Sequence, residues 1–97
     1  MIKIGLLARL EAKPGKEQEL ADFVRNAKTS VEQEPDTVNW YALQIGDSTF
    51  VTFFTFENKE GLQAHMDSPV VKGLMEKAPE LLAQHPVIEH AEILAVK

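Results

Sequence analysis

The sequence contains no cysteine, and this absence excludes several kinds of chemistry at once. Disulfide bonds, thiolate metal sites and cysteine nucleophiles all require a thiol. A chain that needs no disulfide suits a reducing compartment, so we expect a cytoplasmic protein. The amino-terminal apolar run agrees with this expectation, because it is short and is interrupted by Lys3 and Arg9, unlike a signal peptide.

Positive charge is also scarce. Ten Lys and Arg residues stand against fifteen Asp and Glu residues, which gives a formal net charge of -5, and no cluster of basic residues occurs. Nucleic acids and anionic membranes would repel such a chain. No apolar run approaches the roughly 20 residues of a membrane helix. We therefore expect neither nucleic acid nor membrane as a partner.

Motifs for common cofactors and nucleophiles are missing as well. The chain has no Gly-rich nucleotide fingerprint, no serine nucleophile elbow and no His-Glu-x-x-His pair. Its three histidines, His65, His85 and His90, are too scattered for a recurrent metal-ligand spacing. The sequence therefore predicts no metal site.

The chain is organised around residues 49–68, an apolar strand that leads directly into a short helix. Phe50, Phe54 and Phe56 share one face of the strand, while Val51 and Phe53 share the other. Because both faces are apolar, we expect both to be covered. Asn58 is a favoured N-cap for the helix, whose apolar stripe contains His65.

Periodicity predicts the remaining elements. Alternating patterns predict strands over residues 2–12, 38–45 and 87–96. A stripe of apolar residues predicts a helix over about 15–33, ended by Glu34 and Pro35. A further helical piece starts at Ser68, a capping serine, and ends at His85 and Pro86, with a kink or restart at Pro79.

This order predicts one α+β domain over residues 1–97, a ferredoxin-like βαββαβ sandwich with a four-stranded antiparallel sheet. Helices would cover one face of the sheet. The other face would carry several of the apolar residues Leu7, Tyr41, Leu43, Phe50, Val51, Phe53 and Phe54. A bare patch of that size is rare, so we expect a homodimer joined sheet to sheet, a dimeric α+β barrel.

Several segments resemble the antibiotic biosynthesis monooxygenase (ABM) family, whose members are small dimeric α+β barrels. They are the turn at residues 13–17, the lead into the second strand at residues 34–37 and above all FENKEGLQAHMDSPVVKGL at residues 56–74. The resemblance implies oxygenation of a small aromatic, phenolic or quinol substrate, without a metal or other cofactor.

Candidate site residues follow from that resemblance. His65 is the candidate proton acceptor and Asn39 the candidate donor to an oxyanion. Candidate substrate-binding residues are Trp40, Tyr41, Phe54, Phe56 and Met66. Trp40 and Tyr41 point to opposite faces of their strand, and either one could line the pocket.

Other interpretations stay open. His65 could be a structural histidine between helix and sheet, and the aromatic residues could be core and dimer interface. The protein could instead isomerise or degrade a small oxygenated metabolite, or bind a hydrophobic ligand without chemistry. Haem degradation is not expected, because the residues used by the haem-degrading branch are replaced near Leu7, Phe56 and Met75.

Overall fold

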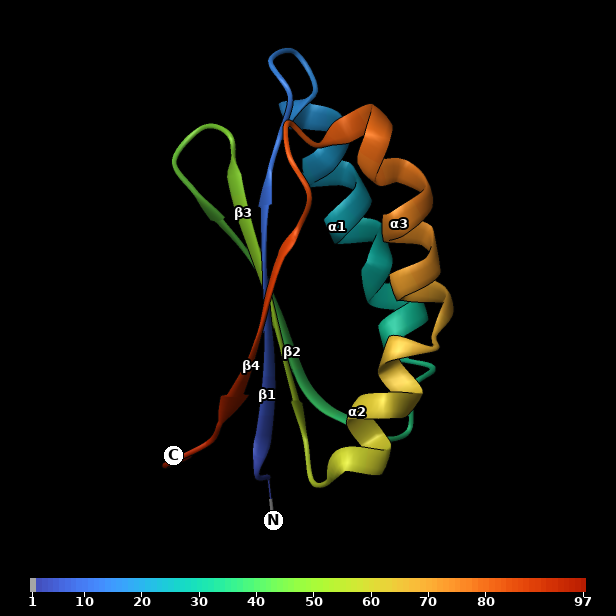
Figure 1. Ribbon diagram of the computed structural model, residues 1–97, viewed down its shortest axis with the longest axis vertical. Helices are drawn as coiled ribbons and strands as arrows, with labels where there is room; N and C mark the ends of the chain where they lie inside the picture. The colour runs from blue at the N-terminus through green and yellow to red at the C-terminus, as the bar shows by residue number, and fades with distance from the viewer. Residues whose placement is uncertain (1) are drawn as a thin grey trace.

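Four antiparallel strands form one sheet, and three helices lie against one of its faces (Figure 1). The computed structural model describes residues 2–97. The strands are β1 (Ile4–Glu11), β2 (Thr37–Ile45), β3 (Thr49–Phe56) and β4 (Val87–Glu92), and the helices are α1 (Glu17–Val31), α2 (Lys59–Met66) and α3 (Pro69–Leu81). The sheet order is β2-β3-β1-β4. This is the ferredoxin-like βαββαβ arrangement that the sequence predicted, with two helices in the second crossover.

Some element boundaries differ from the predicted ones. Pro79 lies inside α3, which continues through it to Leu81 and forgoes the one backbone hydrogen bond that residue 79 would donate. Strand β4 ends at Glu92 rather than at residue 96. Ser68 occupies the N-cap of α3 but its hydroxyl makes no capping bond, whereas the Asn58 side chain accepts a hydrogen bond from the Gly61 N–H at 2.9 Å.

Strand β3 lies between β1 and β2, and its even-numbered side chains face the helices. Phe50, Phe54 and Phe56 are therefore all buried there. Our prediction that Phe50 and Phe54 could lie on the uncovered face was wrong, because alternation says which residues share a face but not which face the helices cover. Val51 and Phe53 do lie on the uncovered face, where the Phe53 ring packs over Gly5; a Cβ at Gly5 would approach that ring to 2.8 Å.

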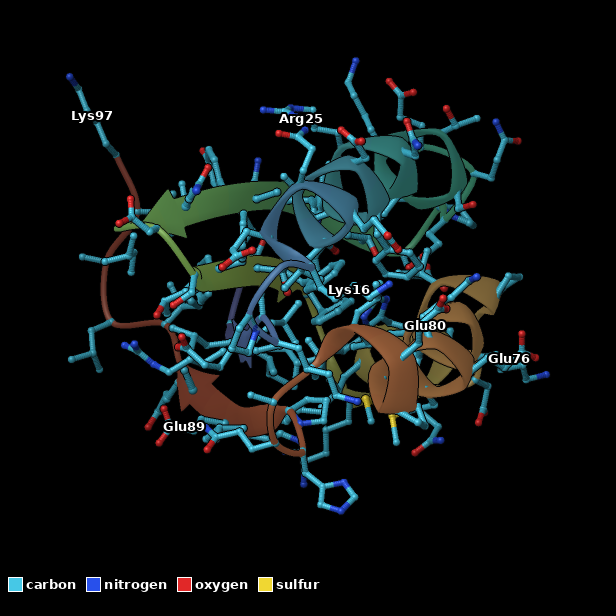
Figure 2. The ribbon with its side chains drawn as sticks, turned by 90° about the horizontal axis from the view of Figure 1, so that it is seen from above. Lys16, Arg25, Glu76, Glu80, Glu89 and Lys97 are labelled. Carbon is cyan, nitrogen blue, oxygen red and sulfur yellow. The ribbon has the colours of Figure 1, made fainter. Side chains whose placement is uncertain are left out.

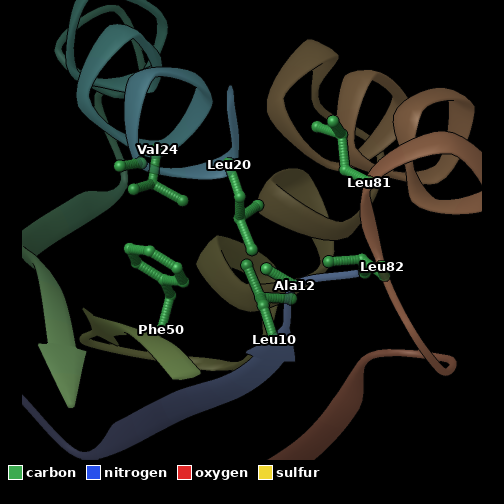
Figure 3. Packing of buried hydrophobic residues seen from close by; sticks show 8 residues of the cluster. Leu10, Ala12, Leu20, Val24, Phe50, Leu81 and Leu82 are labelled. Atoms are coloured by element: carbon green, nitrogen blue, oxygen red, sulfur yellow. The ribbon is translucent and has the colours of Figure 1, made fainter. Parts of the chain in front are cut away.

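The helix-covered core has two parts. One part, which we call the packed end, lies where α1 meets the end of α3 (Figure 3). Its buried residues are Leu10, Ala12, Leu20, Ala21, Val24, Phe50, Leu81 and Leu82. The other part, the cavity end, has Leu6, Val31, Phe54 and Phe56 as its buried apolar residues, with Trp40, Leu62 and Met66 packed against them.

Charged side chains lie on the outside of this core. Figure 2 shows Arg25 of α1 and Glu76 of α3 projecting outward from the helices, with Glu89 and Lys97 at the other side of the molecule. Among the helices of residues 2–97, none is long and apolar enough to cross a membrane.

Candidate functional site

A cavity lies between the sheet and the helices, and residues of both parts of the core line it, among them Phe54 of the cavity end and Leu10 of the packed end. The space between its lining atoms, with the open solvent at its mouth included, is about 580 Å³. The sheet contributes Leu6, Ala8 and Phe54, and α1 and α3 contribute Val24 and Leu74. Only Trp40, Thr52 and His65 bring hydrogen-bonding side chains to this lining. Such a site suits a small, mainly apolar ligand that makes a few directed polar contacts.

His65 is the titratable group of this cavity. The apolar stripe of α2 turns it toward the sheet, where its side chain is 2% exposed. Its ring centroid lies 4.1 Å from that of Phe54 and 5.6 Å from that of Phe56. The Nδ1 atom lies 2.8 Å from Glu34 Oε1, while Nε2 makes no hydrogen bond within residues 2–97. One nitrogen is thus held and the other is free to meet a ligand.

Glu34, which follows α1, is the residue that sequence reasoning missed. Its side chain is 13% exposed, and its Oε1 also accepts a hydrogen bond from Thr37 Oγ1 at 2.9 Å. We treated Glu34 as the end of a helix before Pro35 and as part of the 34–37 segment that resembles the family, but not as a partner of His65. Glu34 and His65 are 31 positions apart in the sequence, so no local spacing could have revealed the pair.

Trp40 settles which side of β2 faces the cavity. Its ring lies 6.2 Å from Phe54, centroid to centroid, and its indole Nε1 is buried without a hydrogen-bond partner. Tyr41 points the other way and is 57% exposed. Trp40 lines the cavity and its buried N–H lacks an acceptor, so a ligand with an acceptor close to Nε1 would satisfy it.

The other predicted residues fall in different places. Phe54 and Met66 line the cavity, whereas Phe56 is fully buried beside the His65 ring and outside the lining. Asn39 lies on the uncovered face of the sheet, where its Oδ1 accepts a hydrogen bond from Thr55 Oγ1 at 3.1 Å. Asn39 and Tyr41 are therefore outside the cavity of their own chain.

The remaining histidines and acids do not form a second site. His85 and His90 are exposed. Within residues 2–97, no three His, Asp or Glu side chains are placed to hold a metal ion together. The Glu11 carboxylate, next to the packed end, accepts hydrogen bonds from Ser48 and from Thr49 Oγ1, and these two bonds hold the pKa of Glu11 below its ordinary value of 4.5.

Fold and cavity together define a small α+β domain that can enclose a small molecule between its helices and its sheet. The model of the antibiotic biosynthesis monooxygenase family matches residues 3–77, which run from β1 into α3. That match covers most of the chain. The protein therefore belongs to the antibiotic biosynthesis monooxygenase family.

Solved structures agree with this assignment. NE2512, a protein of unknown function from Nitrosomonas europaea, is 44% identical and has a TM-score of 0.98, covering 100% of this chain and 94% of its own. Rv0793 from Mycobacterium tuberculosis is 17% identical with a TM-score of 0.86, covering 97% of each chain. A Caulobacter crescentus protein, provisionally assigned as an antibiotic biosynthesis monooxygenase, is 18% identical with a TM-score of 0.83, covering 97% and 92%. At 17% and 18% identity, the likeness shows the fold.

Comparison of sequences identifies one further relative. The uncharacterized protein sll1783 of Synechocystis is 28% identical over 86 residues, which are 84% of this chain. The chain spans 56% of that relative's length, or about half.

Proposed function

We propose that this protein is a cofactor-independent monooxygenase that acts on a small phenol or quinol bound in the cavity. One observation carries the proposal: a buried imidazole, paired with a carboxylate on one side, meets an otherwise apolar cavity on the other. A phenolic ring suits the apolar walls, and its hydroxyl suits the imidazole. Family membership supports the reaction type.

His65 acts as the proton acceptor in the proposed reaction. Removing the hydroxyl proton makes the substrate electron-rich enough to react with O₂ by itself. A phenol and one O₂ then give a quinone and one water, so the ring gains one oxygen atom and supplies all the electrons. The apolar walls exclude bulk water from the reactive intermediate.

Trp40 orients the substrate. Its buried Nε1–H donates to the oxygen that becomes negatively charged when the hydroxyl loses its proton. Phe54, between Trp40 and His65, stacks on the substrate ring, and Met66 adjusts to its outline.

The proposed working unit is a homodimer. On the uncovered face Tyr41 and Leu43 are largely exposed, and the Phe53 ring lies beside them on the neighbouring strand. A second copy related by a two-fold axis would bury this surface on both chains. Light scattering at micromolar concentration should give twice the 10.8 kDa of one chain, and Leu43→Asp should return the mass to one chain. A single-chain mass for the wild type would remove the dimer.

Oxygen consumption with a panel of hydroquinones and naphthols tests the reaction. Autoxidation is measured without protein and subtracted. His65→Gln should lower kcat by about 100-fold or more, as expected for a lost general base. The exposed His85→Gln is the matched control and should leave turnover unchanged. With ¹⁸O₂, the quinone should carry one labelled atom. Turnover that His65→Gln leaves intact would refute the role of His65.

Two competing functions are outcomes of the same experiment. Product formed without oxygen would favour an isomerase or a degrading enzyme. Quenching of Trp40 fluorescence by a ligand that stays chemically unchanged would favour a non-catalytic binding protein.

A further inference from the structure

His65 lies between two hollows of different character. On one side is the apolar cavity described above. On the other side is a crevice between the loop that follows α1 and the junction of α2 with α3. Glu34, Thr37 and Ser68 line this crevice together with His65. Among the described residues that line the cavity and the crevice, His65 is the one that lines both.

Two buried oxygen atoms in this crevice have no hydrogen-bond partner. One is Glu34 Oε2, and the other is the hydroxyl of Ser68, a residue that is 6% exposed. Buried polar atoms of native proteins nearly always have a partner, which can be an ordered water. The Ser68 hydroxyl is also released from its usual role, since it does not cap α3.

We propose that Glu34 is a positioning residue that sets which ring nitrogen of His65 carries the proton, and that a water bound to Glu34 Oε2 and Ser68 Oγ completes the hydrogen bonds of its carboxylate. The catalytic part of this inference rests on the proposed function. An ionised carboxylate at 2.8 Å accepts from Nδ1–H, so the proton of the neutral ring sits on Nδ1. The lone pair is then on Nε2, the nitrogen without a protein partner.

The arrangement also stabilises the charged ring. When Nε2 takes the proton of the substrate, the Nδ1 proton stays on His65 and the new positive charge lies beside the Glu34 carboxylate. Thr37 donates to the same Oε1 and fixes its direction. The other charged side chain lining the crevice is Asp36, which is exposed and makes no ion pair with the ring. Glu34 therefore supplies the counter-charge.

The opposite protonation state gives a sharp alternative. If Glu34 were protonated, it would donate to a bare Nδ1, and the ring proton would sit on Nε2. His65 would then present a donor to the cavity rather than a lone pair, and could not accept the proton of the substrate. The second state holds one proton more than the first, and the two are distinguished by which ring nitrogen of His65 carries a proton.

Nuclear magnetic resonance of the imidazole nitrogens distinguishes them. Long-range ¹H–¹⁵N spectra of ¹⁵N-histidine protein, recorded from about pH 6 to about pH 9, report the tautomer of each ring. The His65 signal is assigned by its loss in His65→Gln. We expect the Nδ1–H form for His65 in the wild type and the more usual Nε2–H form in Glu34→Ala. An Nε2–H form of His65 in the wild type would overturn the inference.

Kinetics test the role of the charge. Glu34→Gln keeps an acceptor for Nδ1–H but removes the counter-charge, so we expect kcat to fall by about 10- to 100-fold with KM nearly constant. Glu34→Asp should recover part of that loss. Glu32→Gln, two residues away and exposed, removes the same charge without touching His65 and is the matched control. Equal kcat values for Glu34→Gln and Glu32→Gln would refute the counter-charge role.

These readouts separate this inference from the proposed reaction. The tautomer is measured on the resting protein and needs no substrate. If no hydroquinone or naphthol is turned over but the Nδ1–H form is found, the oxygenase proposal fails and the Glu34–His65 arrangement stands. If turnover depends on His65 but its resting ring carries the proton on Nε2, the oxygenase reaction stands, while the Glu34–His65 arrangement and the role of His65 as proton acceptor both fail.

Discussion

The packed end and the cavity end of the core are covered by the same helices and the same sheet, yet they are filled differently. At the packed end, Leu10, Leu20 and Phe50 are almost completely buried, and every side chain of the cluster is apolar. At the cavity end, apolar residues surround His65 and line much of the cavity, which also reaches Leu10 and Val24 of the packed end. We infer that the packed end provides most of the stability, while the cavity end gives up some packing to form a site.

Two carboxylates show the same contrast. Glu11, beside the packed end, accepts one hydroxyl hydrogen bond on each of its oxygens. Glu34, at the cavity end, accepts a hydrogen bond from Thr37 on Oε1, which also lies 2.8 Å from His65 Nδ1, and leaves Oε2 buried without a partner. A carboxylate whose two oxygens both accept hydrogen bonds is typical of a structural role. A buried carboxylate with one free oxygen is costly to maintain, so it points to function.

The largest expected effect is on the packed end. Phe50→Ala removes a ring that is 2% exposed, so we expect a loss of about 3–5 kcal/mol in the free energy of unfolding. Met66→Ala, at the wall of the cavity, should cost only about 1–2 kcal/mol because Met66 is half-buried. Urea denaturation at one fixed protein concentration measures both. Equal losses would mean that the two ends do not differ in packing.

A matched pair of alanines on α1 tests the comparison from the opposite direction. Ala21 lies in the packed end and Ala27 lines the cavity. Ala21→Leu should destabilise the protein by about 1–3 kcal/mol, because a close-packed core has no room for the added carbons. Ala27→Leu should change stability little but weaken ligand binding by filling the cavity. Titration of Trp40 fluorescence measures binding, and tight binding to Ala27→Leu would place the ligand elsewhere.

Sequence periodicity predicted much of the fold because the spacing of apolar residues within each helix or strand shows which side of that element is buried. The alternation in β1 and β3 and the stripe of α1 are local, and the structure has all three. The sequence was less informative about which face of the sheet each side chain occupies. Phe50 and Phe54 were correctly grouped, but the choice of face depends on where α1 and α3 lie, which no single strand records.

The site was harder to predict than the fold. The apolar stripe of α2 directed attention to His65, and Trp40 was chosen as an aromatic strand residue with its direction left open. Glu34 could not be found, since its partner is on another element and the pairing depends on how the α1–β2 loop crosses α2. The polar contacts between distant elements carry the chemistry here, and they leave no pattern along the chain.

A third effect separates binding from stability at the cavity end. Trp40→Phe keeps an aromatic ring beside Phe54 but removes the buried Nε1–H. We expect ligands with an oxygen acceptor to lose about 0.5–1.5 kcal/mol of binding free energy, the usual net value of a hydrogen bond. Stability should fall only by the packing lost with the smaller ring, since the lost donor has no protein partner. Isothermal titration calorimetry against a matched ligand that lacks the acceptor is the control. The same loss for both ligands would exclude a directed bond from Trp40.

The smallest effect concerns Glu11, and its sign follows from its hydrogen bonds. Because Ser48 and Thr49 lower the pKa of Glu11 in the folded protein, its ionised form stabilises the fold above the ordinary value of 4.5. That contribution should fade as the pH drops below about 4.5 through the lower folded pKa. Glu11→Gln should therefore be less stable than the wild type near pH 7, and the difference should shrink in acid. Thermal unfolding across this range, with the exposed Glu57→Gln as control, measures it. If the deficit of Glu11→Gln stayed constant down to about pH 2, the two hydroxyls would be bonding the neutral acid as well as its anion, and Glu11 would not be the structural counterpart of Glu34.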